Sequence, residues 1–209
     1  LLRGYGLTEV SSVCTANVAG AYKENSIGRP LAELRVEIWD DRHKKLPPNT
    51  IGEIVVSGDT VMNCYLDKTD DCFHYDRKGN KWVLTGDLGY MDEDGYFFFT
   101  GRKKRMIIIS GYNVYPATIE RKVLSLDYIA EACACQGYDE NGKPYVKLVV
   151  APANPEADRD ELTEKLMAFC KDNIEGYSCP RRIFVMDALP RTKMEKIDFM
   201  KLSDPVPQA

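Results

Sequence analysis

Three neighbouring segments decide how this chain folds: W-V-L-T-G-D at Trp82–Asp87, G-R-K-K-R at Gly101–Arg105 and S-G-Y-N-V-Y-P-A-T-I-E at Ser110–Glu120. The first segment belongs to a predicted hairpin strand. The third segment places Pro116 where the first turn of a helix accepts proline. The basic run lies where a sequence that predicts mostly strands gives way to one that predicts both strands and helices. We therefore predict a domain boundary at about residues 101–105.

The residues before this boundary predict a mostly β structure. Leu34–Ile38 alternates apolar and charged residues, and Gly52–Ser57 follows a Pro-containing turn, which indicates two strands. The Asp-Gly step within Asp92–Gly95 supplies the positive φ that a hairpin turn requires. We therefore predict a hairpin between Trp82–Met91 and Tyr96–Thr100.

The residues after the boundary mix strands with helices. We predict strands at Met106–Ile109, 129–137, 145–151 and Ile183–Met186, and helices that begin at Pro116 and near Asp160. The second helix carries four apolar residues on one face before Gly176, namely Leu162, Leu166, Phe169 and Ile174. This half therefore predicts a small α+β module.

Size and charge limit the possible function classes. With 209 residues, 23.7 kDa and 44% hydrophobic residues, the chain can bury one large or two small cores, and we expect two domains, 1–101 and 102–209. The first carries 11 Lys and Arg against 16 Asp and Glu, and the second 17 against 16. Neither balance is typical of a nucleic-acid-binding protein, so we expect no nucleic-acid partner.

The cysteines and the hydropathy pattern indicate the compartment. Seven cysteines form an odd set without a C-x-x-C pair, and Cys133 and Cys135 alternate with alanines as packing residues of a strand. We therefore expect neither a disulfide framework nor a zinc site. No apolar run approaches the ~20 residues that cross a bilayer, so we expect a soluble, cytoplasmic protein. The start at Leu1 lacks a Met and leads into a predicted loop, which suggests a beginning within a domain.

Two groups of residues indicate nucleotide chemistry. In the segment Tyr5–Glu9, the aromatic ring could stack on a base and the glycine could let a ligand approach the backbone. The hydroxyl that follows could bond a phosphate, and the acid could hold a cation. An ordinary loop with a Thr-Glu helix start is the alternative. Asp87 and Arg102 pair a carboxylate with a guanidinium beside glycine-containing turns. Together these residues point to an enzyme that uses a nucleotide.

Six motifs in chain order carry a resemblance to a known family. They are Y-G-L-T-E (5–9), G-E-I-V-V-S-G (52–58), L-T-G-D (84–87), G-R-K-K (101–104), S-G-Y-N-V-Y-P (110–116) and P-R-T-K-M-E-K-I (190–197). The chain resembles the adenylate-forming (AMP-binding) superfamily, acyl-CoA synthetase branch, but only the C-terminal portion of its sequence. The resemblance implies an α+β fold. An incomplete β-rich subdomain, a distorted barrel at 1–101, would precede a small mobile lid domain at 102–209.

The resemblance implies a nucleotide site in the first half. Tyr5 would pack on adenine, Thr8 would contact the α-phosphate and Glu9 would help to hold Mg²⁺. Asp87 would accept hydrogen bonds from both ribose hydroxyls, and Arg102 would donate to the ribose from the other side. An ordinary turn residue is the alternative for Asp87.

The resemblance also implies a hinge and a catalytic lysine. Lys104 matches the hinge about which the lid swings between two half-reactions, whereas four adjacent cations would otherwise be a solvated turn. Lys196 matches the catalytic lysine, which neutralises charge on the α-phosphate and the carboxylate. Glu195 replaces the glycine that usually precedes it, and a glycine would allow a backbone shape that glutamate resists. A surface lysine paired with Glu195 is the alternative.

The loop at Ser110, Gly111 and Tyr112 is similar to that of the CoA-using branch. Its glycine would let the pantetheine arm of CoA pass close to the backbone. The resemblance therefore implies CoA, rather than a carrier-protein thiol, as the acyl acceptor, with ATP or AMP and Mg²⁺ as the other ligands.

These inferences combine into one functional hypothesis. The chain is expected to be the C-terminal part of an ATP-dependent carboxylate–CoA ligase, with fatty acid metabolism as context. The family's Ser/Thr/Gly-rich phosphate loop has no counterpart here, so the chain alone is not expected to turn over. A non-catalytic AMP- or CoA-binding lid module and a domain that loads a carrier protein stay open as alternatives. Without the earlier part of the family's sequence, the β-rich half would expose apolar surface. We therefore expect copies of this chain to self-associate through that half, with strands exchanged between them.

Overall fold

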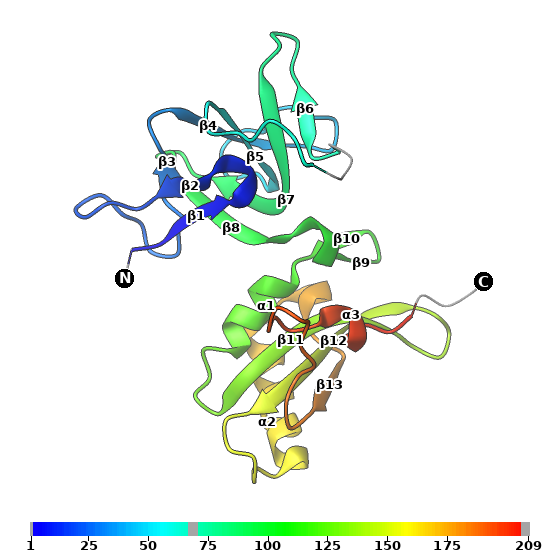
Figure 1. Ribbon diagram of the computed structural model, residues 1–209. Coiled ribbons are helices and arrows are strands. Elements are labelled where there is room, and N and C mark those ends of the chain that lie inside the picture. The colour runs from blue at the N-terminus through cyan, green and yellow to red at the C-terminus, as the bar shows by residue number, and fades with distance from the viewer. Residues whose placement is uncertain (1, 67–70, 206–209) are drawn as a thin grey trace. The chain divides into compact units, whose positions relative to one another are not determined.

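The computed structural model of the protein describes residues 2–66 and 71–205. The chain divides into two compact units, unit 1 at Leu1–Lys104 and unit 2 at Arg105–Ala209. Strands dominate unit 1, whereas unit 2 combines strands with helices (Figure 1). The predicted α+β class, with a β-rich part before a mixed part, is confirmed.

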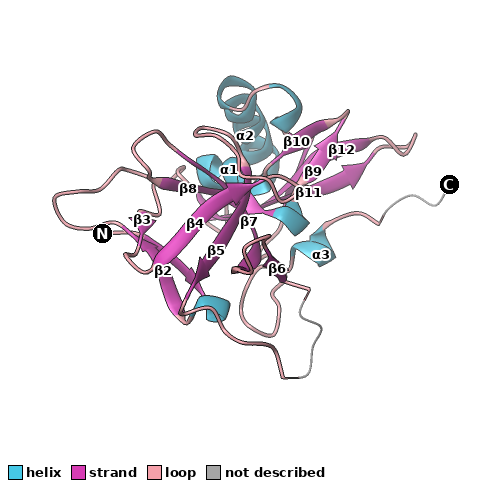
Figure 2. Ribbon diagram, turned by 90° about the horizontal axis from the view of Figure 1, so that it is seen from above, coloured by secondary structure: helices cyan, strands magenta, loops and turns pink. Residues whose placement is uncertain are grey.

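A curled half-barrel sheet forms the body of unit 1 (Figure 2). Its strands are β4 (Leu34–Trp39), β5 (Gly52–Gly58), β6 (Phe73–Tyr75), β7 (Lys81–Met91) and β8 (Phe97–Arg102). They pair antiparallel in the order β4-β5-β7-β6, and β8 also pairs with β7. The predicted strands near 34–38 and 52–57 and the hairpin around Asp92–Gly95 are confirmed.

This sheet buries apolar side chains on both faces. Val56 and Val83 belong to the main core of unit 1, whereas Val55 packs with Trp39 and Trp82 on the opposite face. The two indole rings lie 4.8 Å apart between centroids. Successive residues of a strand point to opposite faces, so neighbours such as Val55 and Val56 enter different cores.

A second, small sheet contains the start of unit 1. Its antiparallel strands are β1 (Gly4–Leu7), β2 (Ser12–Ala16) and β3 (Arg29–Pro30), and the 3₁₀ turn η1 (Thr8–Val10) joins β1 to β2. The prediction of a loop at the start of the chain is therefore wrong from Gly4 onward. A four-residue strand interrupted by a register shift between Tyr5 and Gly6 contains too little alternation to be recognised in the sequence.

A three-stranded sheet forms the body of unit 2 (Figure 1). Its strands are β11 (Ile129–Tyr138), β12 (Pro144–Pro152) and β13 (Arg182–Val185). β9 (Ile107–Ile109) and β10 (Tyr112–Val114) form a separate antiparallel pair. The helices of this unit are α1 (Pro116–Val123), α2 (Arg159–Asn173) and α3 (Phe199–Leu202), and η3 (Gly176–Ser178) is a 3₁₀ turn. The 3₁₀ turn η2 (Lys103–Arg105) includes the last two residues of unit 1 and the first residue of unit 2.

β11 sorts its residues between two cores. Ala132 and Ala134 pack in the core that includes Leu166 of α2, whereas Cys133 and Cys135 pack in a second core on the other face. The predicted alternation is confirmed, and all seven cysteines are free thiols.

The predicted end of the second helix is wrong by one residue. α2 ends at Asn173, and Ile174 is an extended C-cap residue that is nevertheless buried. The helix begins after Asp158, whose carboxylate accepts hydrogen bonds from the backbone N–H groups of Asp160 and Glu161. None of the helices within residues 2–66 and 71–205 has both the length and the apolarity that crossing a bilayer requires.

Candidate active site

Asp87 lies at the centre of a polar cluster in unit 1. It stands in β7 directly opposite Arg102 of β8, so the strand register brings the two side chains together. Arg102 Nε lies 2.8 Å from Asp87 Oδ1, and the Tyr5 hydroxyl donates a 2.7 Å hydrogen bond to Oδ2. Asp87 is only 3% exposed. The structure thus brings together three of the residues that the sequence predicted to bind a nucleotide.

One oxygen of this buried carboxylate lacks a hydrogen-bond donor. Arg102 Nε is close to Oδ1, but its N–H does not point along a hydrogen bond, and no other donor in the described part of the chain satisfies that oxygen. The Arg102 side chain is 62% exposed, so the cluster reaches solvent on that side. A ligand hydroxyl could supply the missing donor.

Burial controls the electrostatics of the cluster. It raises the pKa of Asp87 above the usual carboxyl value, against the opposing hydrogen bond from Tyr5 and charge of Arg102. Burial also raises the pKa of Tyr5, and the Asp87 charge adds to that rise. Tyr5 is therefore a permanent donor, and a further donor to Oδ1 would favour the ionised carboxylate.

The backbone around Asp87 is held by residues of the quoted motifs to which the sequence assigned no role of their own. Thr85 Oγ1 donates to a β5 carbonyl at 2.6 Å and accepts from Asp87 N at 3.0 Å. Glu53 accepts from Gly86 N at 2.9 Å and from Lys103 Nζ at 3.0 Å. The Glu53 side chain is 12% exposed, and a carboxylate in an otherwise apolar strand was the sequence signal for such a role.

Thr8 and Glu9 follow Tyr5 on the η1 turn. Thr8 is exposed, and Glu9 accepts a hydrogen bond from the Tyr65 hydroxyl. The Glu9 charge is near enough to raise the pKa of Asp87. No three His, Cys, Asp or Glu residues gather into a metal site among the residues described. Mg²⁺ often binds only one or two protein carboxylates and completes its coordination shell with phosphates and water. Glu9 could be such a single carboxylate ligand.

Lys104 is an exposed residue between two anchored neighbours. Lys103, before it, pairs with a β5 carboxylate of unit 1. Arg105, after it, forms an ion pair with Glu120 of α1 and donates to the Ala134 carbonyl at 3.3 Å, both in unit 2. The division of the chain into units falls immediately after Lys104. Its predicted role as a hinge is not tested by this arrangement.

Ser110 and Gly111 form a tight turn between β9 and β10. Their φ values are +51° and +86°, the two positive values that a two-residue hairpin turn requires, so the turn itself accounts for the glycine. Tyr112 stacks on Tyr177, with 4.3 Å between ring centroids, and both rings are about half exposed. The adjoining pocket is lined by side chains that include Ser110, Lys143, Tyr177, Cys179 and Arg181.

Lys196 lies in an exposed loop of unit 2. Within the described ranges it has no ion pair, so the alternative of a lysine paired with Glu195 is not what the structure contains. Glu195 has φ +59°, a left-handed conformation that favours glycine. The glutamate at this position thus adopts a backbone conformation that a glycine would adopt more easily.

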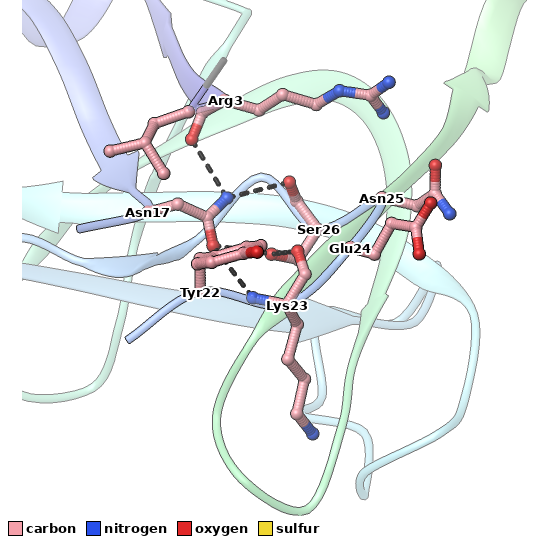
Figure 3. Close-up of a pocket in the computed structure, with 8 residues that line it drawn as sticks. Arg3, Asn17, Tyr22, Lys23, Glu24, Asn25 and Ser26 are labelled. Carbon is pink, nitrogen blue, oxygen red and sulfur yellow. Dashed lines mark hydrogen bonds between the residues drawn. The ribbon is translucent and has the colours of Figure 1, made fainter. Parts of the chain in front are cut away.

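Unit 1 contains another pocket that includes none of the predicted site residues (Figure 3). Asn17 organises it. The Asn17 amide donates to the carbonyls of Arg3 and Ser26, each at 3.0 Å. Its oxygen accepts from Ser26 Oγ at 2.9 Å and from Lys23 N at 3.3 Å. The amide uses all four of its hydrogen-bonding positions within the chain, which is typical of a structural residue.

Comparisons with known proteins identify the family of the chain. The family "AMP-binding enzyme" matches residues 1–66, and "AMP-binding enzyme C-terminal domain" matches residues 118–196. The two matches cover most of the chain and leave Asp87 and Arg102 between them. The chain belongs to the adenylate-forming (AMP-binding) superfamily and corresponds to a C-terminal portion of its members.

Individual relatives are similar over almost the whole chain. A long-chain-fatty-acid–CoA ligase of Escherichia coli O6:H1 is 34% identical over 98% of this chain. The o-succinylbenzoate CoA synthetase of Bacillus subtilis, solved with ATP and magnesium ion, is 30% identical over 97% of this chain with a TM-score of 0.83. Its complex with the acyl-adenylate intermediate is 31% identical over 98%, with a TM-score of 0.84. The chain spans only 36% of the first relative and 41% of the second.

Proposed function

We propose that the protein carrying this chain is an ATP-dependent carboxylate–CoA ligase, and the buried Asp87 carboxylate carries the proposal. Its Oδ2 is held by Tyr5, whereas its Oδ1 lacks a donor in the described part of the chain. The ribose of adenosine offers two neighbouring hydroxyl donors, which an ionised carboxylate can accept. Arg102, on the exposed side, would donate to the same sugar.

The first half-reaction would form an acyl-adenylate. An oxygen of the acid attacks the α-phosphorus of ATP, and the bond to pyrophosphate breaks. Thr8 would contact the α-phosphate, and Glu9 would share Mg²⁺ with the nucleotide phosphates. The metal would neutralise phosphate charge. Lys196, whose ammonium has no ion pair among the residues described, would add positive charge to the pentavalent transition state.

The second half-reaction would transfer the acyl group to CoA. The CoA sulfur attacks the acyl carbon, AMP leaves, and the thiol proton passes to solvent. The turn at Ser110 and Gly111 would lie beside the pantetheine arm. The stacked Tyr112 and the basic rim of the adjoining pocket suit the planar base and phosphates of CoA. Rotation about Lys104 would exchange the two half-reactions.

The proposal has a defined extent. Residues 1–101 would be the last, β-rich subdomain of the AMP-binding domain, and residues 102–209 the lid. This chain alone would bind AMP weakly and would not turn over, because the phosphate loop is absent from its sequence. The relatives use acids as different as long-chain fatty acids and o-succinylbenzoate, so no particular acid is proposed. Fatty acid metabolism, a cytoplasmic location and self-association of this chain stay predictions.

Lys196→Ala in the complete protein tests the ligase. Adenylation, measured as acid-dependent ATP–pyrophosphate exchange, is expected to fall about 10²- to 10³-fold, the effect of removing one preorganised electrostatic group. Lys193→Ala is the matched control, because Lys193 is an exposed lysine of the same loop. Unchanged exchange in Lys196→Ala would refute the proposed mechanism.

One observation favours a second candidate, a non-catalytic AMP- or CoA-binding lid module. Glu195 places a side chain and a negative charge beside Lys196 at a strained position. A complete protein that binds AMP but shows no exchange with any acid would support this module. A carrier-protein-loading domain would instead give exchange without CoA-dependent release of AMP.

A further inference from the structure

The loop that carries Lys196 is fastened to the sheet of unit 2 by one guanidinium. Arg191 Nη2 forms an ion pair with the Glu131 carboxylate of β11, and Arg191 Nη1 donates to the Glu195 carbonyl at 2.7 Å. The other oxygen of Glu131 accepts from Leu189 N at 2.9 Å. Glu131 therefore holds both the start of the loop and the arginine that reaches its far side.

The loop itself is a small hairpin. Arg191 and Ile197 pair as an antiparallel bridge, Thr192 N donates to Lys196 O at 2.8 Å, and Glu195 N donates to Thr192 O at 3.0 Å. The three loop residues are 193–195. In such loops the last residue has a positive φ, and here that residue is Glu195 with φ +59°. Non-glycine residues hold this conformation only where their surroundings fix it.

The Arg191 contact acts on the peptide that joins Glu195 to Lys196. A peptide unit is planar and rigid, so fixing its carbonyl also fixes the direction in which the chain enters Lys196. On the other side of Lys196, Ile197 packs against the core around Cys133 and Cys135. The exposed Lys196 side chain makes no ion pair in the described part of the chain. Its starting orientation therefore depends on the backbone that these contacts hold.

We infer that Arg191, itself held by Glu131, is a positioning residue for Lys196. It fixes the strained Glu195 peptide and thereby aims the ammonium group in the adenylation step. This inference rests on the proposed function, because positioning Lys196 matters only if Lys196 assists adenylation.

Arginine suits this task better than lysine. Its planar guanidinium can reach the carboxylate with one nitrogen and the carbonyl with another, whereas an ammonium is a compact point charge. Arg191→Lys would keep the attraction to Glu131 and lose the simultaneous contact with Glu195 O. This substitution thus separates the positioning of Lys196 from the anchoring of the loop.

The experiment compares two half-reactions in the complete protein. Arg191→Ala and Arg191→Lys are expected to lower acid-dependent pyrophosphate exchange about 10- to 100-fold, since small errors of placement have effects of this size. Thioester formation from preformed acyl-AMP and CoA should stay within about twofold of the unmodified protein. Arg159→Ala is the matched control, because Arg159 pairs with the exposed Asp187 of unit 2 at 2.5 Å and should change neither rate.

A readout independent of activity uses the 209-residue chain. Amide hydrogen exchange at Thr192 and Glu195, whose N–H groups close the hairpin, should speed up at least tenfold in Arg191→Lys, with the β11 amides unchanged. Equal losses in both half-reactions, or unchanged hairpin exchange, would overturn the positioning role. If Lys196→Ala lowers adenylation and the Arg191 variants do not, this inference alone fails. If Lys196→Ala has no effect, the proposed function fails and the inference with it.

Discussion

The Asp87 cluster and the Lys196 loop present charge in opposite ways. Asp87 is 3% exposed, lies within a strand and is contacted by Tyr5 from the start of the chain and by Arg102 from the facing strand of its own hairpin. Lys196 is exposed on a short hairpin, and the contacts that orient it act on its backbone. One site keeps its charge away from water, and the other leaves its charge in water.

This difference predicts different responses to substitution. A buried carboxylate with an incomplete set of donors opposes folding and favours a ligand that completes the set, so changes at Asp87 should affect affinity and stability in opposite directions. An exposed ammonium contributes little to stability, so changes around Lys196 should affect rates through geometry. The following substitutions test that contrast.

Asp87→Asn should give the largest effect. AMP affinity of the complete protein is expected to fall about 100-fold, since each hydrogen bond to a charged group contributes about 1.5–3 kcal/mol. The melting temperature should not fall, because a buried charge is removed and Arg102 remains largely solvated. Calorimetric titration with AMP and thermal unfolding measure both effects.

Asp41→Asn is the control for that experiment. Asp41 pairs with Lys103 at 2.8 Å but its side chain is 87% exposed, so its removal should leave both quantities unchanged. Undiminished AMP binding by Asp87→Asn would remove Asp87 from the nucleotide site.

Tyr5→Phe should have a smaller effect, and on stability. It removes the 2.7 Å donor to Asp87 Oδ2 and leaves that oxygen buried, which should lower the free energy of unfolding by about 2 kcal/mol. In the Asp87→Asn background the same change should cost only about 1 kcal/mol, because a neutral partner replaces the carboxylate. Urea unfolding of the four proteins gives the coupling energy, and strict additivity would argue against the contact.

The pH dependence follows from the raised pKa of Asp87. Because the folded-state pKa lies above the ordinary value of 3.8, the contribution of this group to stability is greatest below that value and is lost as pH rises through the folded pKa. AMP binding should change in the opposite sense, since only the ionised carboxylate accepts both ribose hydroxyls. The stability difference between Asp87→Asn and the unmodified chain isolates this group. A difference that stays constant with pH would contradict the assigned shift.

The sequence predicted those parts of the fold that have a clear period or a clear turn signal. β4 and the opposite faces of Ala134 and Cys135 followed from alternation, whereas β5 followed from an apolar run after a turn and β7 from the Asp-Gly step of its hairpin. β1 was not predicted, because four residues with a register shift show no period.

The candidate site divides in the same way. Motifs identified Asp87 and Arg102, whose proximity the β7–β8 register then explains. Glu53 and Arg191 lie within quoted motifs but received no role of their own, because their roles depend on contacts with Gly86 and with Glu195 that only the folded backbone creates. Residues that touch a ligand can be found from chemistry, whereas residues that hold them require the three-dimensional contacts.

Glu195→Gly should give the smallest effect and separates two explanations for this position. Glycine has no Cβ, so relieving the left-handed conformation should raise the free energy of unfolding by about 1–2 kcal/mol. The greater freedom of glycine in the unfolded chain should lower it by about 0.5–1 kcal/mol. The free energy of unfolding should therefore rise by about 0.5–1 kcal/mol.

Glu195→Ala removes the carboxylate but retains a Cβ at φ +59°, so it should bring no such gain. Urea unfolding of this chain measures both variants. An equal gain in the two would assign the effect to charge beside Lys196 rather than to backbone shape. A gain in Glu195→Gly alone would mean that the Arg191 contact holds a strained peptide in place. In that case Arg191→Lys should speed hydrogen exchange in the hairpin more strongly in the natural Glu195 background than in Glu195→Gly, because only the glutamate has strain to release.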